Sequence, residues 1–215
     1  MNKFSPIPLF LIALFAGVQI YAFAQSAGDA DGRDVGNGGG AWVCRSRRGE
    51  VLWIQLVDLF EAQESGHALI RPTGDVSAIV NQVMTALEQA DLPFHHALLP
   101  YVTRLNSLEE TQDQIIYSDE VLESTDDALY WFHPETEGRC RRGTFRPDPA
   151  RPARPEQVVN FRVDGTVWIQ EELFRALPVV ERAALVLHEA IYAYRRVAFG
   201  DLDSVLSRII VGVVF

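Results

Sequence analysis

Apolar residues recur at helical spacing in the middle of the chain. Between residues 75 and 90 they lie three and four positions apart, at Val76, Ile79, Val80, Val83, Met84 and Leu87. This spacing predicts an amphipathic helix that buries one face. Asp75 is expected to cap its start, and Pro93 is expected to stop it. A second helix is predicted over residues 94–108.

Shorter apolar runs predict strands at residues 41–45, 114–117 and 128–132. Residues 51–63 begin strand-like (VLWIQL) and end helix-like (VDLFEAQ), so both interpretations stay open. Residues 158–163 and 166–169 flank Asp164-Gly165, a dipeptide typical of a hairpin turn. Residues 146–155 hold four prolines among arginines and predict an extended surface loop.

The C-terminal part predicts helices at residues 171–177, 179–199 and 204–211. On a helical wheel, one side of the middle helix is apolar, and the other carries Glu181, Arg182, His188, Glu189, Tyr192, Arg195 and Arg196. We therefore expect His188, Glu189 and Tyr192 to lie outside the central core, facing solvent or a cleft. A cleft is favoured because no ion pair at three- or four-residue spacing supports a solvated face.

These elements predict an α+β fold, a single disulfide-bonded domain with a small antiparallel sheet or hairpins packed with helices. The predicted divisions are a signal peptide at 1–24, a flexible Gly- and Asp-rich N-terminus at 25–40 and one globular domain at 41–215. The glycine run 36–40 is interpreted as a linker or turn rather than a phosphate site, because no strand is predicted before it.

The first 24 residues have the pattern of a secretory signal. Lys3 is followed by an apolar stretch and by Ala22-Phe23-Ala24, after which a signal peptidase is expected to cut. The stretch is short for a bilayer span, which needs about 20 apolar residues. The sequence therefore predicts a periplasmic or secreted protein with no membrane span after cleavage.

Charge and cysteine content limit the partners and the compartment. Lys3 is the only lysine, and the remaining 18 arginines face 29 acidic residues, a net charge of −11 after cleavage. This balance argues against a nucleic-acid partner. In an oxidising compartment, Cys44 and Cys140 are expected to form a disulfide. Closing so long a loop contributes about 4–5 kcal/mol on the chain-entropy model.

The helix with the sequence ALVLHEAIY carries candidate chemistry. A zinc-protease helix uses His-Glu-x-x-His, which places two imidazoles on one metal and a glutamate beside the bound water. Here His188 and Glu189 are present, but Tyr192 replaces the second histidine. A metal would need His188, Tyr192 as a phenolate, and a third ligand; Asp201, Asp203 and His133 are candidates without diagnostic spacing.

Three segments carry a family resemblance: GNGGGAWVC at residues 36–44, GTVWIQEELFRALP at 165–178 and ALVLHEAIY at 184–192. Together they resemble a group of uncharacterised exported proteins of Gram-negative bacteria. The resemblance implies a periplasmic or secreted location and a zincin-like arrangement of hairpin and helix. It implies no established activity.

Two functional hypotheses follow. In the first, the protein is a divergent metal-dependent peptidase or hydrolase in which His188 binds zinc, Glu189 is the general base and Tyr192 binds the metal or an oxyanion. In the second, it is a non-catalytic periplasmic or secreted protein that binds a peptide or a glycan in the same cleft. Metal content discriminates between them.

Overall fold

The computed structural model describes residues 35–36, 39–67, 69, 72–106, 115–122, 140–141, 144–145, 153–162, 166–201 and 203–215. The predicted signal peptide, the strand predicted at 128–132 and His133 lie outside these residues. The described part is mixed α+β, which confirms the predicted class. No helix within it is long and apolar enough to cross a bilayer.

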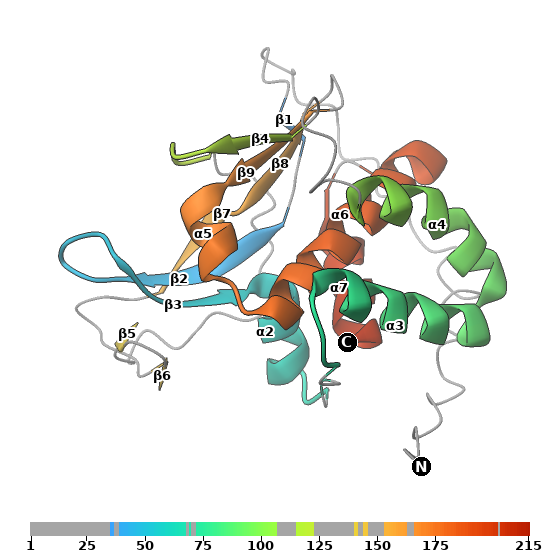
Figure 1. The fold of residues 1–215 in the computed structure, drawn as a ribbon, viewed down its shortest axis with the longest axis horizontal. Helices are drawn as coiled ribbons and strands as arrows, with labels where there is room; N and C mark the ends of the chain where they lie inside the picture. The colour runs from blue at the N-terminus through green and yellow to red at the C-terminus, as the bar shows by residue number, and fades with distance from the viewer. Residues whose placement is uncertain are drawn as a thin grey trace.

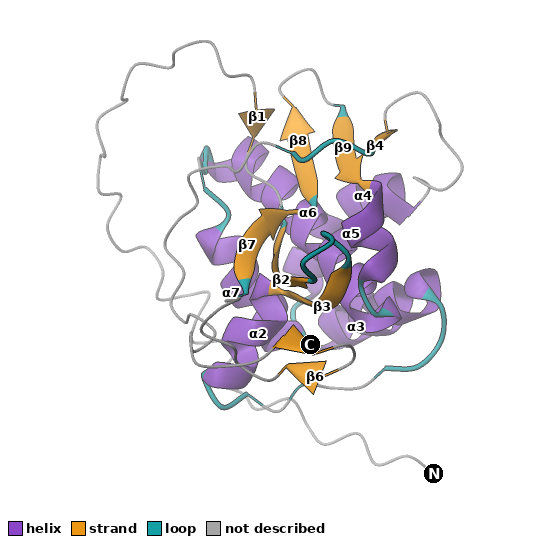
Figure 2. Ribbon diagram, turned by 90° about the vertical axis from the view of Figure 1, so that its left-hand side faces the viewer, coloured by secondary structure: helices purple, strands orange, loops and turns teal. Residues whose placement is uncertain are grey.

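Two small sheets lie on one side of the molecule (Figure 1). One has the order β1 (Val35–Gly36), β8 (Val159–Arg162), β9 (Val167–Gln170), β4 (Ile115–Ser118), and only the β4–β9 pair is parallel. The other has the antiparallel order β3 (Val51–Leu56), β2 (Gly40–Arg45), β7 (Arg154–Gln157). Figure 2 shows β1, β8 and β9 above β7, β2 and β3.

A short ladder and the helices complete the described elements. The ladder pairs β5 (Cys140–Arg141) with β6 (Thr144–Phe145). The helices are α2 (Val57–Glu64), α3 (Val76–Ala90), α4 (Leu92–Asn106), α5 (Glu171–Ala176), α6 (Val179–Phe199) and α7 (Val205–Val214). Helix α6 packs against α2, α3, α4, α7 and β3, and is therefore the central element of the fold (Figure 1).

The predicted helix at 75–90 is confirmed as α3. The side chain of Asp75 accepts the N–H of Ala78 at 2.8 Å and caps the helix, as expected. Pro93 plays a different part from the one predicted. It lies in the first turn of α4, where a missing N–H costs nothing, and the chain turns between Ala90 and Leu92.

The two interpretations of residues 51–63 are both correct, one after the other. Strand β3 ends at Leu56, and α2 begins at Val57 without a connecting loop. The predicted hairpin is confirmed by β8 and β9, in which Val159 lies opposite Ile169; its turn lies outside the described residues. The loop predicted up to residue 155 is too long, because Arg154 and Pro155 belong to β7 and pair with β2.

The largest correction concerns the two-sided pattern of α6. Its middle is buried on every side: His188 is 0% exposed, Tyr192 1% and Glu189 3%. The expectation that His188 and Tyr192 lie outside the core is therefore wrong. The wheel separates residues by polarity, but α6 is enclosed by helices on several sides, so its polar residues must be buried as well.

Candidate functional site

His188 faces α2 and is held by a carboxylate. Its Nδ1 lies 2.7 Å from Oδ2 of Asp58, a residue of the first turn of α2 that is only 1% exposed. Within the described part of the chain, Nε2 of His188 and Oδ1 of Asp58 are buried and make no hydrogen bond. The pair is therefore a buried contact between two helices, and Asp58 also lines a second pocket of about 170 Å³ together with Glu61, His67 and Arg208.

A second ionic contact lies on the same side of α6 as the pair of His188 and Asp58. Arg208 on α7 lies with its Nε 3.5 Å from Oε2 of Glu61 on α2. The two helices cross closely at Gly212, where a Cβ atom would stand 2.9 Å from the Cβ of Ala62. Side chains larger than glycine at this position would therefore push α7 away from α2 and open the enclosure around Asp58.

The protonation of His188 follows from these neighbours. Burial alone lowers the pKa of His188, but the charge of Asp58 and its hydrogen bond raise it, and the charge of Glu189 adds to this effect. Arg208 opposes the rise, and the pKa of His188 is raised overall. The charge and the hydrogen bond of Asp58 therefore favour the protonated imidazole.

Glu189, the next residue, points to a different side of α6. Its Oε1 accepts the backbone N–H of Gly39 at 2.6 Å, a contact between positions 150 residues apart. The carbonyl of Gly39 in turn accepts the N–H groups of Val158 and Val159. Gly39, from the Gly-rich segment, thus joins Glu189 to the start of β8.

Only glycine fits at position 39. A Cβ atom there would stand 2.1 Å from Cδ1 of Leu185 and 3.2 Å from Oε1 of Glu189. At Gly40 a Cβ atom would meet ordinary contacts at 3.7 Å and beyond. The glycine run is therefore required at one position, where the backbone approaches α6 closely enough to bind the Glu189 carboxylate.

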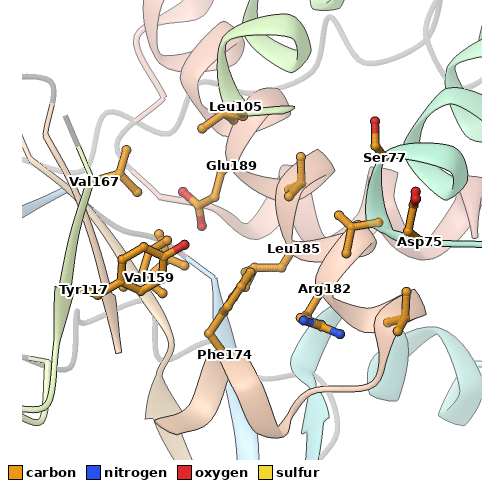
Figure 3. Close-up of a pocket in the computed structure, with 14 residues that line it drawn as sticks. Asp75, Ser77, Leu105, Tyr117, Val159, Val167, Phe174, Arg182, Leu185 and Glu189 are labelled. Carbon is orange, nitrogen blue, oxygen red and sulfur yellow. The ribbon is translucent and has the colours of Figure 1, made fainter. Parts of the chain in front are cut away.

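Glu189 also lines a pocket of about 270 Å³ (Figure 3). The carboxylate points away from α6 towards the strands that carry Val159 and Val167. The walls are mostly apolar and come from six other elements: Val76 of α3, Leu105 of α4, Tyr117 of β4, Val159 of β8, Val167 and Ile169 of β9, and Phe174 of α5.

Helix α6 contributes one stripe of residues to this pocket. Val179, Arg182, Leu185, Val186 and Glu189 recur at three- and four-residue spacing and so lie on one face. The guanidinium carbon of Arg182 lies 5.9 Å from the centre of the Phe174 ring. Asp75 and Ser77, at the start of α3, line the pocket too. The pocket thus has a carboxylate and a guanidinium on one helix face, with apolar side chains between them.

Glu181 is a further charged residue of α6 that lies near the core. Its Oε2 accepts the N–H of Leu56, the residue where β3 meets α2, at 2.6 Å. Burial raises the pKa of Glu181 to about 7; the bond from Leu56 opposes the rise, and the nearby charge of Asp58 adds to it. Glu181 therefore changes charge near neutral pH.

Within the described part of the chain, Asp201 and Asp203 are not brought to His188, and His133 lies outside that part. Tyr192 is buried and is not among the residues that line the pocket. Asp201 follows α6 and accepts a bond from Nε of Arg195 at 2.5 Å, while Asp203 accepts the N–H of Val205. Across the described residues, no group of three His, Cys, Asp or Glu side chains could hold a metal ion. Among the described residues, His188 therefore has no complete zinc ligand set around it.

The cysteines lie in neighbouring strands. Cys44 is fully buried in β2, and β5, which begins at Cys140, contacts both β2 and β3. This arrangement is compatible with the predicted disulfide, which stays a prediction.

Sequence reasoning missed Asp58, Gly39 and the role of Arg182. Asp58 lies 130 positions from His188, and only the tertiary packing of α2 on α6 joins them. One signal for Gly39 was present, because five glycines and asparagines in a row before a buried strand often mark a close backbone approach.

Comparisons of the chain with family models, with curated protein sequences and with solved structures each found no match. Function is therefore inferred from the geometry of the site alone.

Proposed function

We propose that this protein is an exported, non-catalytic binding protein, and that its ligand site is the pocket lined by Glu189. The ligand carries a cationic group on an apolar body, as the amino end of a short peptide does. The observation that supports this proposal is a buried carboxylate that points into a mostly apolar pocket.

The energetics of the carboxylate favour a cationic ligand. A cationic group next to a buried carboxylate stabilises the charge of that carboxylate. The N–H of Gly39 provides one hydrogen bond to Oε1 and fixes the orientation of the side chain. An ammonium group placed at the carboxylate would form a charge-assisted hydrogen bond, which is about twice as strong as a neutral one.

Of the two ligand classes expected from the sequence, the walls favour a peptide over a glycan. A glycan presents many hydroxyl groups, and each one buried without a partner is costly. Most of this pocket is lined by valines, leucines, an isoleucine and Phe174, and its polar groups are Asp75, Ser77, Tyr117, Arg182 and Glu189. Apolar side chains of a peptide match such walls.

A divergent metal-dependent hydrolase is the second candidate, on one observation. Histidines that bind metals often donate their other ring nitrogen to a carboxylate, as Nδ1 of His188 does to Asp58. The full burial of His188 and the lack of further ligands in the described part of the chain count against it. Zinc analysis of the purified protein decides: one tightly bound zinc per chain would support the hydrolase.

Export remains part of the proposal. It rests on the signal sequence at residues 1–24 and on the pair Cys44 and Cys140. A free-thiol assay on denatured, unreduced protein purified from the periplasm or medium should find no reactive cysteine. Two free thiols would contradict the oxidising compartment.

The binding proposal is tested with a simple amine. Phenethylamine should bind the purified mature protein, and phenethyl alcohol, which lacks the charge, should bind at least about tenfold more weakly. Glu189→Gln should remove this preference, while Glu88→Gln, a change of an exposed glutamate on α3, should leave it intact. Equal binding of the amine to the wild type and to Glu189→Gln would refute the proposal.

A further inference from the structure

A second charged anchor lies on the same face of α6 as Glu189. Arg182 lines the pocket seven residues before Glu189, which is nearly two full helical turns. At a rise of 1.5 Å per residue, the two backbone positions lie about 10 Å apart along the helix. Figure 3 shows Leu185 between them and Arg182 beside Phe174.

Arg182 has unused hydrogen-bonding capacity. No acidic side chain forms an ion pair with it in the described part of the chain, and its buried Nε makes no hydrogen bond there. Its guanidinium is positioned by the ring of Phe174. A guanidinium binds a carboxylate through two parallel N–H···O bonds, and this site offers an oriented one without a carboxylate.

The separation of the two backbone positions along α6 gives the scale for the length of the ligand. An extended peptide advances about 3.3–3.6 Å per residue, so three residues span about 10 Å. The amino and carboxyl groups of a single amino acid are much closer together than the anchors, and a longer peptide would have to bulge between them or leave one end outside. Apolar side chains at the centre of the peptide would meet Leu185, Val186 and Ile169.

Asp75 is the other charged group at the pocket, beside Ser77 at the start of α3. Its Oδ1 is already occupied with the N–H of Ala78. Its charge still opposes an anionic group bound at Arg182, so it weakens the proposed contact without abolishing it.

We infer that the ligand is a short, apolar peptide of about three residues with both ends free, whose amino group binds Glu189 and whose carboxylate binds Arg182. This inference rests on the proposed function and adds to it the polarity and length of the ligand. Arg182 is thus a specificity residue that selects free carboxyl ends.

The experiment uses the mature protein and the tripeptide Ala-Val-Ala in four forms: with free ends, with an N-terminal acetyl group, with a C-terminal amide, and extended to Ala-Val-Ala-Val-Ala-Val. Calorimetric titration should show the free tripeptide binding about tenfold more tightly than each of the other three. In Arg182→Gln, the acid and the amide should bind equally, while the acetyl group should still weaken binding. Arg182→Lys, which keeps the charge, should retain part of the preference for the acid. Asp75→Asn should tighten binding of the free acid.

The outcomes separate this inference from the proposed function. If the amide binds the wild type as tightly as the acid, or if the preference for the acid survives in Arg182→Gln, the two-anchor inference is wrong, although the amine site stands. If the acetylated peptide binds as tightly as the free one, or if no form binds, the proposed function itself fails. Should Arg182→Gln not fold, Arg182→Lys and the amide on wild-type protein give the same decision.

Discussion

His188 and Glu189 are adjacent in sequence but lie in different surroundings. His188 faces α2 and α7, where its partner Asp58 is buried and the helices cross closely at Gly212. Glu189 faces a pocket, and its partner is the backbone of Gly39. Neighbours on a helix point about 100° apart, so one helix can serve the core with one residue and a ligand site with the next. His188 and Glu189 therefore contact different parts of the molecule.

The largest effect on stability is expected from breaking the buried pair of His188 and Asp58. Asp58→Ala should lower the free energy of unfolding by about 3–5 kcal/mol, because it removes one partner of a buried ion pair. Urea unfolding measures the loss. Asp119→Ala, a change of an exposed aspartate after β4, serves as the control and should cost less than about 0.5 kcal/mol. The remaining folded Asp58→Ala protein should bind phenethylamine normally; lost binding would show that the two sides are coupled.

A smaller effect is expected where the Gly-rich segment meets α6. Gly39→Ala should destabilise by about 1–3 kcal/mol, since its new methyl group overlaps with Leu185 in a packed region. It should also weaken amine binding, because the N–H that orients Glu189 would move. Gly40→Ala is the matched control, with room for the methyl group and little expected change. Equal effects at the two glycines would mean that Gly39 does not contact α6 closely.

The pH dependence of the free energy of unfolding gives a further test of the ionisable groups on α6. The pKa of Glu181 is raised to about 7, so the folded protein holds more protons than the unfolded chain between about pH 4.5 and 7. Its stabilising contribution is full below about pH 4.5 and is lost as pH rises through 7. The raised pKa of His188 has the same sign: its contribution is full below about pH 6.5 and falls as pH rises through its folded-state pKa.

Urea unfolding at pH 5 and pH 8 measures this dependence, and stability should be higher at pH 5. Glu181→Gln keeps an acceptor for the N–H of Leu56 and removes the charge. It should raise stability at pH 8 by about 2 kcal/mol, allowing for partial exposure to solvent, and should flatten the dependence between pH 4.5 and 7. An unchanged pH profile would contradict the burial of an ionisable Glu181.

The smallest effect on stability is expected at Glu189. Glutamine can accept the N–H of Gly39 as the carboxylate does, so Glu189→Gln should change the free energy of unfolding by no more than about 1 kcal/mol. The same variant should lose amine binding. A large loss of stability with unchanged binding would assign Glu189 to the core and reverse the comparison.

Local patterns in the sequence were sufficient for the elements but not for the site. The spacing of apolar residues gave α3 and its Asp75 cap, and Asp164-Gly165 marked the β8–β9 hairpin. The burial of His188 and Tyr192 could not be obtained in this way, because it depends on how many helices surround α6. The parallel pairing of β4 with β9 likewise joins segments far apart in the chain, and no short turn between them predicts the pairing.

The site depended on contacts that no local pattern encodes. Asp58 and Gly39 reach α6 from 130 and 150 residues away. The zinc-protease pattern drew attention to the right helix but grouped His188, Glu189 and Tyr192 by their spacing. In the structure, only Glu189 of the three lines the pocket, because it points about 100° away from His188, while His188 and Tyr192 are buried in the core.

The central claim, that His188 is a structural cation and Glu189 a ligand-binding anion, is tested most directly by ¹⁵N NMR of the His188 ring at pH 7. The assignment comes from comparison with His188→Gln. The account predicts an imidazolium spectrum, with both nitrogens protonated, that does not change when one equivalent of zinc is added. A neutral ring whose Nε2 signal shifts on stoichiometric zinc binding would contradict it.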